Sequence, residues 1–242
     1  MYNILISVGV AVATFLLLKF AAGLWWWIAL PVAILLFMGV FYLISRIVMK
    51  KVMAVMETAT RDLQAQRVEK GIRELQGAFK YGKWQIYVTG QLNAQIGMIH
   101  YMKRDFTAAF PYLEKSFFKN WVAMGMLAIT YMKRNKKDKM RETFEKAVQA
   151  TPKESLLWNL YAYCLCETDD TGKAKAVLER GVKKLPGDEK CKQNLELLRE
   201  GKKMKMKGFG EMWLQFHLES IGTIQKQQMA AMGGMKRRIV RR

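Results

Sequence analysis

Proline, cysteine and histidine are scarce in this sequence, and each scarcity excludes a class of structure. Four prolines in 242 residues, with no strand-like alternation of apolar and polar residues, predict an all-α chain. The three cysteines, Cys164, Cys166 and Cys191, are odd in number and give no disulfide framework, which fits a reducing compartment.

Motifs of known enzyme chemistry are also missing. The two histidines, His100 and His217, have no Ser, Cys or carboxylate at a spacing that indicates nucleophilic or metal chemistry. The sequence contains no C-x-x-C redox pair, no H-E-x-x-H, no P-loop and no G-x-G-x-x-G. We therefore predict a non-enzymatic protein without a cofactor or a metal ion.

Acidic residues are few: 20 Asp and Glu stand against 40 Lys and Arg, for a formal charge of +20. Such an excess favours contact with anionic lipid, nucleic acid or an acidic protein. The charge is unevenly spread, because residues 4–45 contain one charged side chain, Lys19.

Two long apolar runs, Ile4–Leu18 and Leu24–Ser45, fill this uncharged opening. A bilayer-spanning helix needs about 20 apolar residues, so residues 1–50 predict two antiparallel transmembrane helices. Residues 19–23 would form the turn, and Trp25, Trp26 and Trp27 would lie together at one membrane interface. Two alternatives stay open: a cleaved signal peptide, although residues 1–3 lack its charged side chains, and a re-entrant segment kinked at Pro31.

Basic residues beside the second run set the expected orientation. Arg46, Lys50 and Lys51 follow it, whereas the hairpin turn carries Lys19 alone. The positive-inside rule then places both termini in the cytoplasm, with Lys50 and Lys51 against anionic lipid headgroups. We expect a multi-pass protein of a bacterial inner membrane, and a eukaryotic organelle membrane is the alternative.

A repeat with a period near 34 residues follows residue 51. Three segments superimpose without gaps, with offsets of 31 and 34 residues between copies. Their five matched columns, alternately small and bulky, are Gly97, Ala128 and Ala162; His100, Tyr131 and Leu165; Ala109, Met140 and Ala174; Leu113, Phe144 and Leu178; and Ser116, Ala147 and Gly181. Small residues let paired helices approach, and bulky neighbours fill the groove between them.

Turn residues separate the predicted helices. Thr151–Glu154 combines an N-cap, a first-turn proline and a capping-box acid, and Leu185–Asp188 ends one helix and starts another. Met102–Asp105 and Asp169–Gly172 make the turns inside the first and third copies.

The pattern resembles the tetratricopeptide repeat (TPR) family over about residues 90–187. Tyr131 and Trp158 match two of its favoured aromatic positions. Gly71, Leu75 and Ala78 give a weaker second-helix match in Val68–Lys80, a segment that the sequence allows to continue the second span. Residues 188–200 predict a polar capping helix. We therefore expect a TPR-type α-solenoid over residues 51–200.

The resemblance implies a concave groove that binds other proteins. Candidate groove residues are polar or basic side chains of the first helices: Asn93, Gln95, Lys133 and Asn159. Each has the alternative of a solvated surface residue.

Residues 201–242 form a basic, amphipathic C-terminal segment with ten Lys and Arg and two acids. Its apolar stripe includes Trp213 and Phe216. The stripe either packs on the last repeat helix or lies on anionic lipid together with the basic tail, which consists of Lys236, Arg237, Arg238, Arg241 and Arg242. RNA binding through this tail is a third possibility.

These patterns together predict a membrane-tethered scaffold or assembly factor. Its cytoplasmic repeat groove would recruit proteins of a membrane complex, and the tail would contact anionic lipids. The alternative is a membrane tether for RNA or ribosomes.

Overall fold

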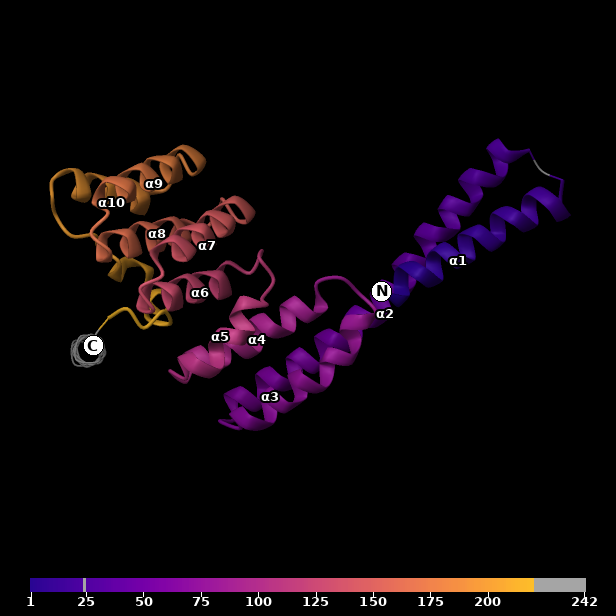
Figure 1. Ribbon diagram of the computed structural model, residues 1–242, viewed down its shortest axis with the longest axis horizontal. Coiled ribbons are helices and arrows are strands. Elements are labelled where there is room, and N and C mark those ends of the chain that lie inside the picture. The colour runs from indigo at the N-terminus through magenta and orange to yellow at the C-terminus, as the bar shows by residue number, and fades with distance from the viewer. Residues whose placement is uncertain (24, 220–242) are drawn as a thin grey trace, which may run out of the picture. The chain divides into compact units, whose positions relative to one another are not determined.

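Helices form almost all of the regular structure of this chain. The computed structural model describes residues 1–23 and 25–219 (Figure 1), and this part of the chain contains helices and turns and no strand, in agreement with the predicted all-α class. Contacts divide the chain into two compact units, Met1–Ala123 and Met124–Arg242, which are described separately below.

An antiparallel hairpin opens the first unit. Helix α1 (Tyr2–Leu16) continues as a π-helical turn through Ala21, and α2 (Trp26–Gln64) returns alongside it (Figure 1). Both helices are long and apolar enough to cross a membrane by length and composition. The turn lies later than predicted, because Lys19 is still helical and the chain reverses near Gly23, whose φ of +62° suits glycine.

The packing inside this hairpin differs from that of a soluble core. Small or polar residues of both helices are buried: Asn3, Ser7, Ala29 and Ala33. Asn3 Nδ2 donates to Ser45 Oγ at 2.7 Å, which joins the two helices at the open end of the hairpin. The large apolar side chains instead face outward, with Leu35 69% exposed. Close contact through small residues is the usual packing of helices in lipid.

Helix α2 is longer than the predicted span. It passes through Pro31 without a break and ends at Gln64, so the boundary that we placed at residue 50 falls inside it. Residues 65–67 then turn the chain, with Gln66 at φ +60°, into α3 (Val68–Gly77). Val68–Lys80 is therefore not a continuation of the second span; the C-terminal half of α2 is that continuation.

The end of α2 and α3 form an additional helix pair of the repeat. Ala59 precedes Gly71 by the same 12 residues that separate Gly97 from Ala109. Helix α2 therefore supplies the first helix that pairs with the weaker second-helix match in Val68–Lys80. Ala59 is buried, and a Cβ at Gly71 would lie 3.1 Å from the Ala59 carbonyl oxygen. Around this contact, Val52, Ile72 and Leu75 join residues of the next helix in one apolar core.

The predicted repeats follow as paired helices. After the 3₁₀ turn Ala78–Lys83 come α4 (Val88–Met102), α5 (Phe106–Glu114), α6 (Trp121–Lys133), α7 (Lys137–Ala150), α8 (Ser155–Glu167), α9 (Thr171–Lys184) and α10 (Glu189–Arg199). The three predicted copies correspond to α4 with α5, α6 with α7 and α8 with α9, and α10 occupies the place of the capping helix. These helices are consistent with an α-solenoid.

Small residues occupy matched columns where the two helices of a pair come close together. A Cβ at Gly97 would lie 2.9 Å from the Leu113 side chain, and one at Gly181 would lie 3.1 Å from the Trp158 ring. Such distances leave no room for a methyl group unless the neighbour moves, so glycine sets the spacing within the pairs α4–α5 and α8–α9.

Three predicted turns are confirmed and one cap is wrong. Asp105, Asp170 and Asp188 each accept backbone N–H groups as N-caps of α5, α9 and α10. Thr151, in contrast, does not cap α8, because its Oγ1 donates to the Ala147 carbonyl and closes α7. Glu154 takes the N-cap position of α8 without a side-chain hydrogen bond.

Candidate protein-binding groove

A column of equivalent residues runs across the first helices of the second unit. Gly125 on α6, Asn159 on α8 and Asn194 on α10 follow one another at intervals of 34 and 35 residues. Buried apolar residues lie close to each of them in the sequence: Ala128, Ala162 and Leu195. Both asparagine side chains are themselves buried. This set is called the inner column below.

The two asparagines of the inner column are linked by hydrogen bonds. Asn159 Nδ2 donates to the Ser155 carbonyl at 2.9 Å and to Cys191 Sγ at 3.1 Å. Its Oδ1 accepts a 2.8 Å hydrogen bond from Asn194 Nδ2. A buried amide is stable only when its donors and acceptors are satisfied, so these bonds fix both side chains in one orientation.

Asn194 also binds the backbone of a later part of the chain. The Lys205 N–H donates to Asn194 Oδ1 at 2.7 Å, and Asn194 Nδ2 lies 3.4 Å from the Lys205 carbonyl oxygen. One side-chain amide thus pairs with both polar groups of a single residue. The contact recognises main chain, so it is independent of the side chain at position 205.

Lys205 belongs to a segment, Lys202–Glu219, that crosses the first helices and is called the strap below. It contains a 3₁₀ turn, Lys207–Phe209, and the short helix α11 (Glu211–Leu214). Trp213 packs edge-on against Tyr163 of α8, with ring centroids 4.9 Å apart. Phe216 lies so close to α6 that a Cβ at Gly125 would be 3.2 Å from its ring.

These contacts decide between two predictions for Trp213 and Phe216. Trp213 is 2% exposed and Phe216 is fully buried, so the stripe packs on the repeats in the described residues. Neither side chain is accessible to a lipid surface in this conformation, and we do not retain them as lipid-binding residues. The basic tail residues Lys236, Arg237, Arg238, Arg241 and Arg242 lie outside the described part of the chain.

A cavity of about 920 Å³ lies beneath the strap, a size typical of ligand sites. Lys190, Lys202, Lys203, Lys205 and Lys207 line it together with Glu167 and Glu219. Burial and the neighbouring Glu167 charge raise the pKa of Tyr163 to about 12, so its hydroxyl stays protonated at neutral pH. The same two causes raise the pKa of Cys166, which leaves a neutral and unreactive thiol there.

The other predicted groove residues have mixed surroundings. Asn93 on α4 is buried, Gln95 on the same helix is partly exposed, and Lys133 at the end of α6 is exposed. Asn159 is in the inner column but is held by its neighbours. Sequence analysis missed Asn194 and Tyr163; the interval of 35 residues from Asn159 to Asn194 was the available signal. Lys50 and Lys51 are exposed on α2.

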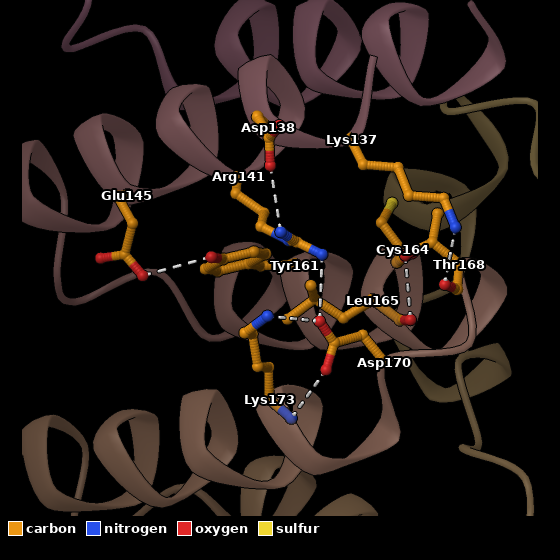
Figure 2. Close-up of polar contacts among 10 residues, drawn as sticks. All are labelled: Lys137, Asp138, Arg141, Glu145, Tyr161, Cys164, Leu165, Thr168, Asp170 and Lys173. Atoms are coloured by element: carbon orange, nitrogen blue, oxygen red, sulfur yellow. Dashed lines mark hydrogen bonds and ion pairs between the residues drawn. The ribbon is translucent and has the colours of Figure 1, made fainter. Parts of the chain in front are cut away.

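A second polar cluster joins consecutive helix pairs (Figure 2). Arg141 of α7 bridges Asp138 and Asp170, both at 3.1 Å, and Lys173 also contacts Asp170. Nearby, Glu145 accepts from the Tyr161 hydroxyl at 3.2 Å. Glu145 also accepts from both terminal nitrogens of Arg180 at 2.8 Å. Hydrogen bonds from Arg180 hold the pKa of Glu145 below its usual value. The cluster connects α7 to α9. Because its charged side chains are paired with one another, we interpret the cluster as structural.

Metal or nucleophilic chemistry finds little support in the described chain. Across residues 1–23 and 25–219, no three His, Cys, Asp or Glu side chains come together in a group that could hold a metal ion. Cys164 is buried, and burial raises its pKa strongly. The prediction that the protein binds no cofactor stays a prediction.

Comparison with known proteins agrees with the helix pairs. Residues 123–154 match the family model described as "Tetratricopeptide repeat". The matched stretch covers most of α6, all of α7 and the turn before α8, which is one helix–turn–helix unit. The match supports the TPR family, and hence a role in protein–protein interaction; repeats of this kind are typically non-catalytic interaction modules. No curated protein and no solved structure matches the chain.

Proposed function

We propose that this protein is a non-enzymatic scaffold or assembly factor, tethered to a bacterial inner membrane by α1 and α2. Its repeat groove recruits partner proteins, which belong to a membrane complex. One observation carries the proposal: α2 is a single helix whose first half has exposed apolar side chains and whose second half packs as a repeat helix. The tether and the first helix pair are therefore one rigid element.

Aromatic residues at both ends of the hairpin support insertion in lipid. Trp25, Trp26 and Trp27 are exposed at the closed end. At the open end, exposed Tyr2 packs on Trp84 with ring centroids 5.5 Å apart, and the Asn3 N–H donates to the Trp84 carbonyl. About 20 helical residues separate the two groups, which corresponds to about 30 Å, the thickness of a bilayer core. Aromatic belts at both interfaces have this arrangement.

Arg46, Lys50 and Lys51, exposed on α2 just beyond the apolar half, favour a cytoplasmic location for the repeats and both termini. We propose that Lys50 and Lys51 contact anionic headgroups. Fusion of a reporter after Arg242 tests this topology. A green fluorescent protein fusion is expected to fluoresce and an alkaline phosphatase fusion to be inactive; an active phosphatase would reverse the topology.

Photo-crosslinking tests the scaffold role. A photoreactive amino acid at Gln95 or Lys133, on first helices, is expected to crosslink a small, defined set of membrane proteins in cells. The same group at Lys183, exposed on the second helix α9, serves as the matched control and is expected to give weaker crosslinks to that set. Equal labelling from all three positions would contradict recruitment through the groove. Partners lost on RNase treatment would favour the alternative, a tether for RNA.

A further inference from the structure

The strap occupies the groove of the second unit in the manner of a bound peptide. After α10, the chain turns at Gly201, whose φ is +73°, and enters the strap. The strap then contacts Asn194 on α10, Tyr163 on α8 and Gly125 on α6 in that order. It therefore visits the first helices in the reverse of their sequence order, across the surface that would receive a partner.

The strap contains little regular secondary structure. Its regular elements are one 3₁₀ turn and a four-residue helix, too short to be stable without packing. Its position depends instead on the Asn194 pairing with Lys205 and on two buried aromatic side chains three residues apart, Trp213 and Phe216. A main-chain clamp combined with aromatic anchors is the chemistry by which domains hold extended peptides.

We propose that the strap is an intramolecular ligand of the groove, and that a partner segment of the same chemistry replaces it. The partner segment has a lysine-flanked extended stretch followed by two aromatic residues three positions apart. Lys190 of α10 donates to the Gly208 carbonyl at 2.8 Å and lies 4.4 Å from the centroid of the Phe209 ring, so it too holds main chain and an aromatic side chain of the strap. This inference rests on the proposed function, because it names the ligand class and the regulation of the same groove.

Tethering makes the strap a strong competitor. A short link gives an attached ligand a local concentration of about a millimolar, so a free segment binds only to the fraction of molecules whose strap has left. Weakening the strap without altering the groove should therefore increase the affinity for a free segment. If the strap were instead a permanent part of the fold, its loss would disturb the repeats themselves.

Strap exchange is measured on the full-length chain in detergent. A protease site inserted after Gly201 allows the link to be cut while Gly125, Tyr163 and Asn194, the residues that the strap contacts on the first helices, stay unchanged. A fluorescent peptide of residues 202–219 is then added. We expect the peptide to replace the cut strap while circular dichroism keeps its helical signal. A peptide carrying Trp213→Ala and Phe216→Ala is the control and is expected to exchange at least tenfold less well. A cut strap that leaves only when the helical signal is lost overturns the proposal.

Uncut variants give an independent readout. The Phe216→Ala chain is expected to bind the labelled peptide at least tenfold more tightly than the wild type. Met212→Ala, four residues earlier in the strap but exposed, is the matched control and should bind as the wild type does. Equal affinity for all three chains overturns the proposal, and if Phe216→Ala fails to fold, the cleavage experiment still decides. Failure of exchange leaves crosslinking from Gln95 and Lys133 intact, whereas failure of the proposed function abolishes those crosslinks with exchange retained.

Discussion

The N-terminal hairpin and the pair α8–α9 use apolar residues in opposite ways. In the hairpin, small and polar residues such as Ser7, Ala29 and Ala33 are buried and the bulky side chains face outward. In α8, bulky Leu157, Trp158 and Leu160 are buried, and the small residues allow helices to approach. Water drives bulky apolar groups inward and lipid does not, so this is the difference expected if the hairpin lies in lipid, as proposed, and the repeats lie in water.

Helix α2 contains both patterns in sequence. Leu35 is exposed in its first half, whereas Val52 and Ala59 are buried in its second half. The change occurs where Arg46, Lys50 and Lys51 appear, so the charge pattern and the packing pattern change at the same place. Two predictions test this contrast and a third tests an ion pair within the repeats, from the largest expected effect to the smallest.

Truncation of a bulky side chain is expected to matter in the repeats and not in the hairpin. Leu157→Ala removes a fully buried side chain, so we expect a loss of about 2–5 kcal/mol in unfolding free energy. Leu35→Ala, the matched control in the hairpin, is expected to change it by less than about 0.5 kcal/mol. Chemical unfolding of the detergent-solubilised chain, followed by circular dichroism, measures both. Similar losses for the two variants would remove the contrast.

Enlargement of Ala59 tests whether the second half of α2 is a repeat helix. Ala59→Leu forces extra atoms against Gly71, where a Cβ would already lie 3.1 Å from the Ala59 carbonyl oxygen. We expect a destabilisation of about 1–3 kcal/mol. Thr60→Leu, at the exposed neighbouring position, is expected to have little effect. If both variants unfold at the same denaturant concentration as the wild type, α2 does not pack as a repeat helix.

Acidification provides the smallest expected effect. The pKa of Glu145 is lowered, chiefly by hydrogen bonds from Arg180. A lowered pKa in the folded state adds stability above the unfolded pKa, and this stability is lost as pH falls through the folded pKa. The pair is partly solvent-exposed, so we expect about 0.2–1 kcal/mol. Glu145→Gln should reduce the acid-induced loss measured by unfolding at a series of pH values; an unchanged pH profile would show that the pair contributes nothing.

Much of the fold could be predicted, because helix pairing repeats in the sequence itself. The column residues Gly97 and Leu113 face each other directly, and Gly181 faces Trp158, an aromatic position that the TPR resemblance had singled out. The sequence pattern therefore reflects direct contacts between paired helices. The first helix of the earliest pair was missed because Ala59 lies in a helix that begins in the apolar run. The Thr151 cap was wrong because a threonine hydroxyl serves equally well at the end of the preceding helix.

The strap could not be predicted from periodicity. Trp213 and Phe216 give an amphipathic stripe that fits lipid, partner or core equally well, since the hydrophobic effect is non-directional. Their burial depends on Tyr163 and Gly125, residues 50 or more positions earlier, and no local pattern encodes that pairing. The interval from Asn159 marks the position of Asn194, but nothing in the sequence shows that its side chain binds the backbone of Lys205.

A depth profile along α2 tests the central claim most directly. Spin labels are placed at Trp26, Leu35, Tyr42, Lys51 and Thr60 in a cysteine-free chain reconstituted in bilayers, and their contact with oxygen and with a water-soluble nickel complex is measured. The account predicts the deepest lipid exposure at Leu35, interfacial values at Trp26 and Tyr42, and water exposure at Lys51 and Thr60. Uniform access of the nickel complex to all five positions would contradict it.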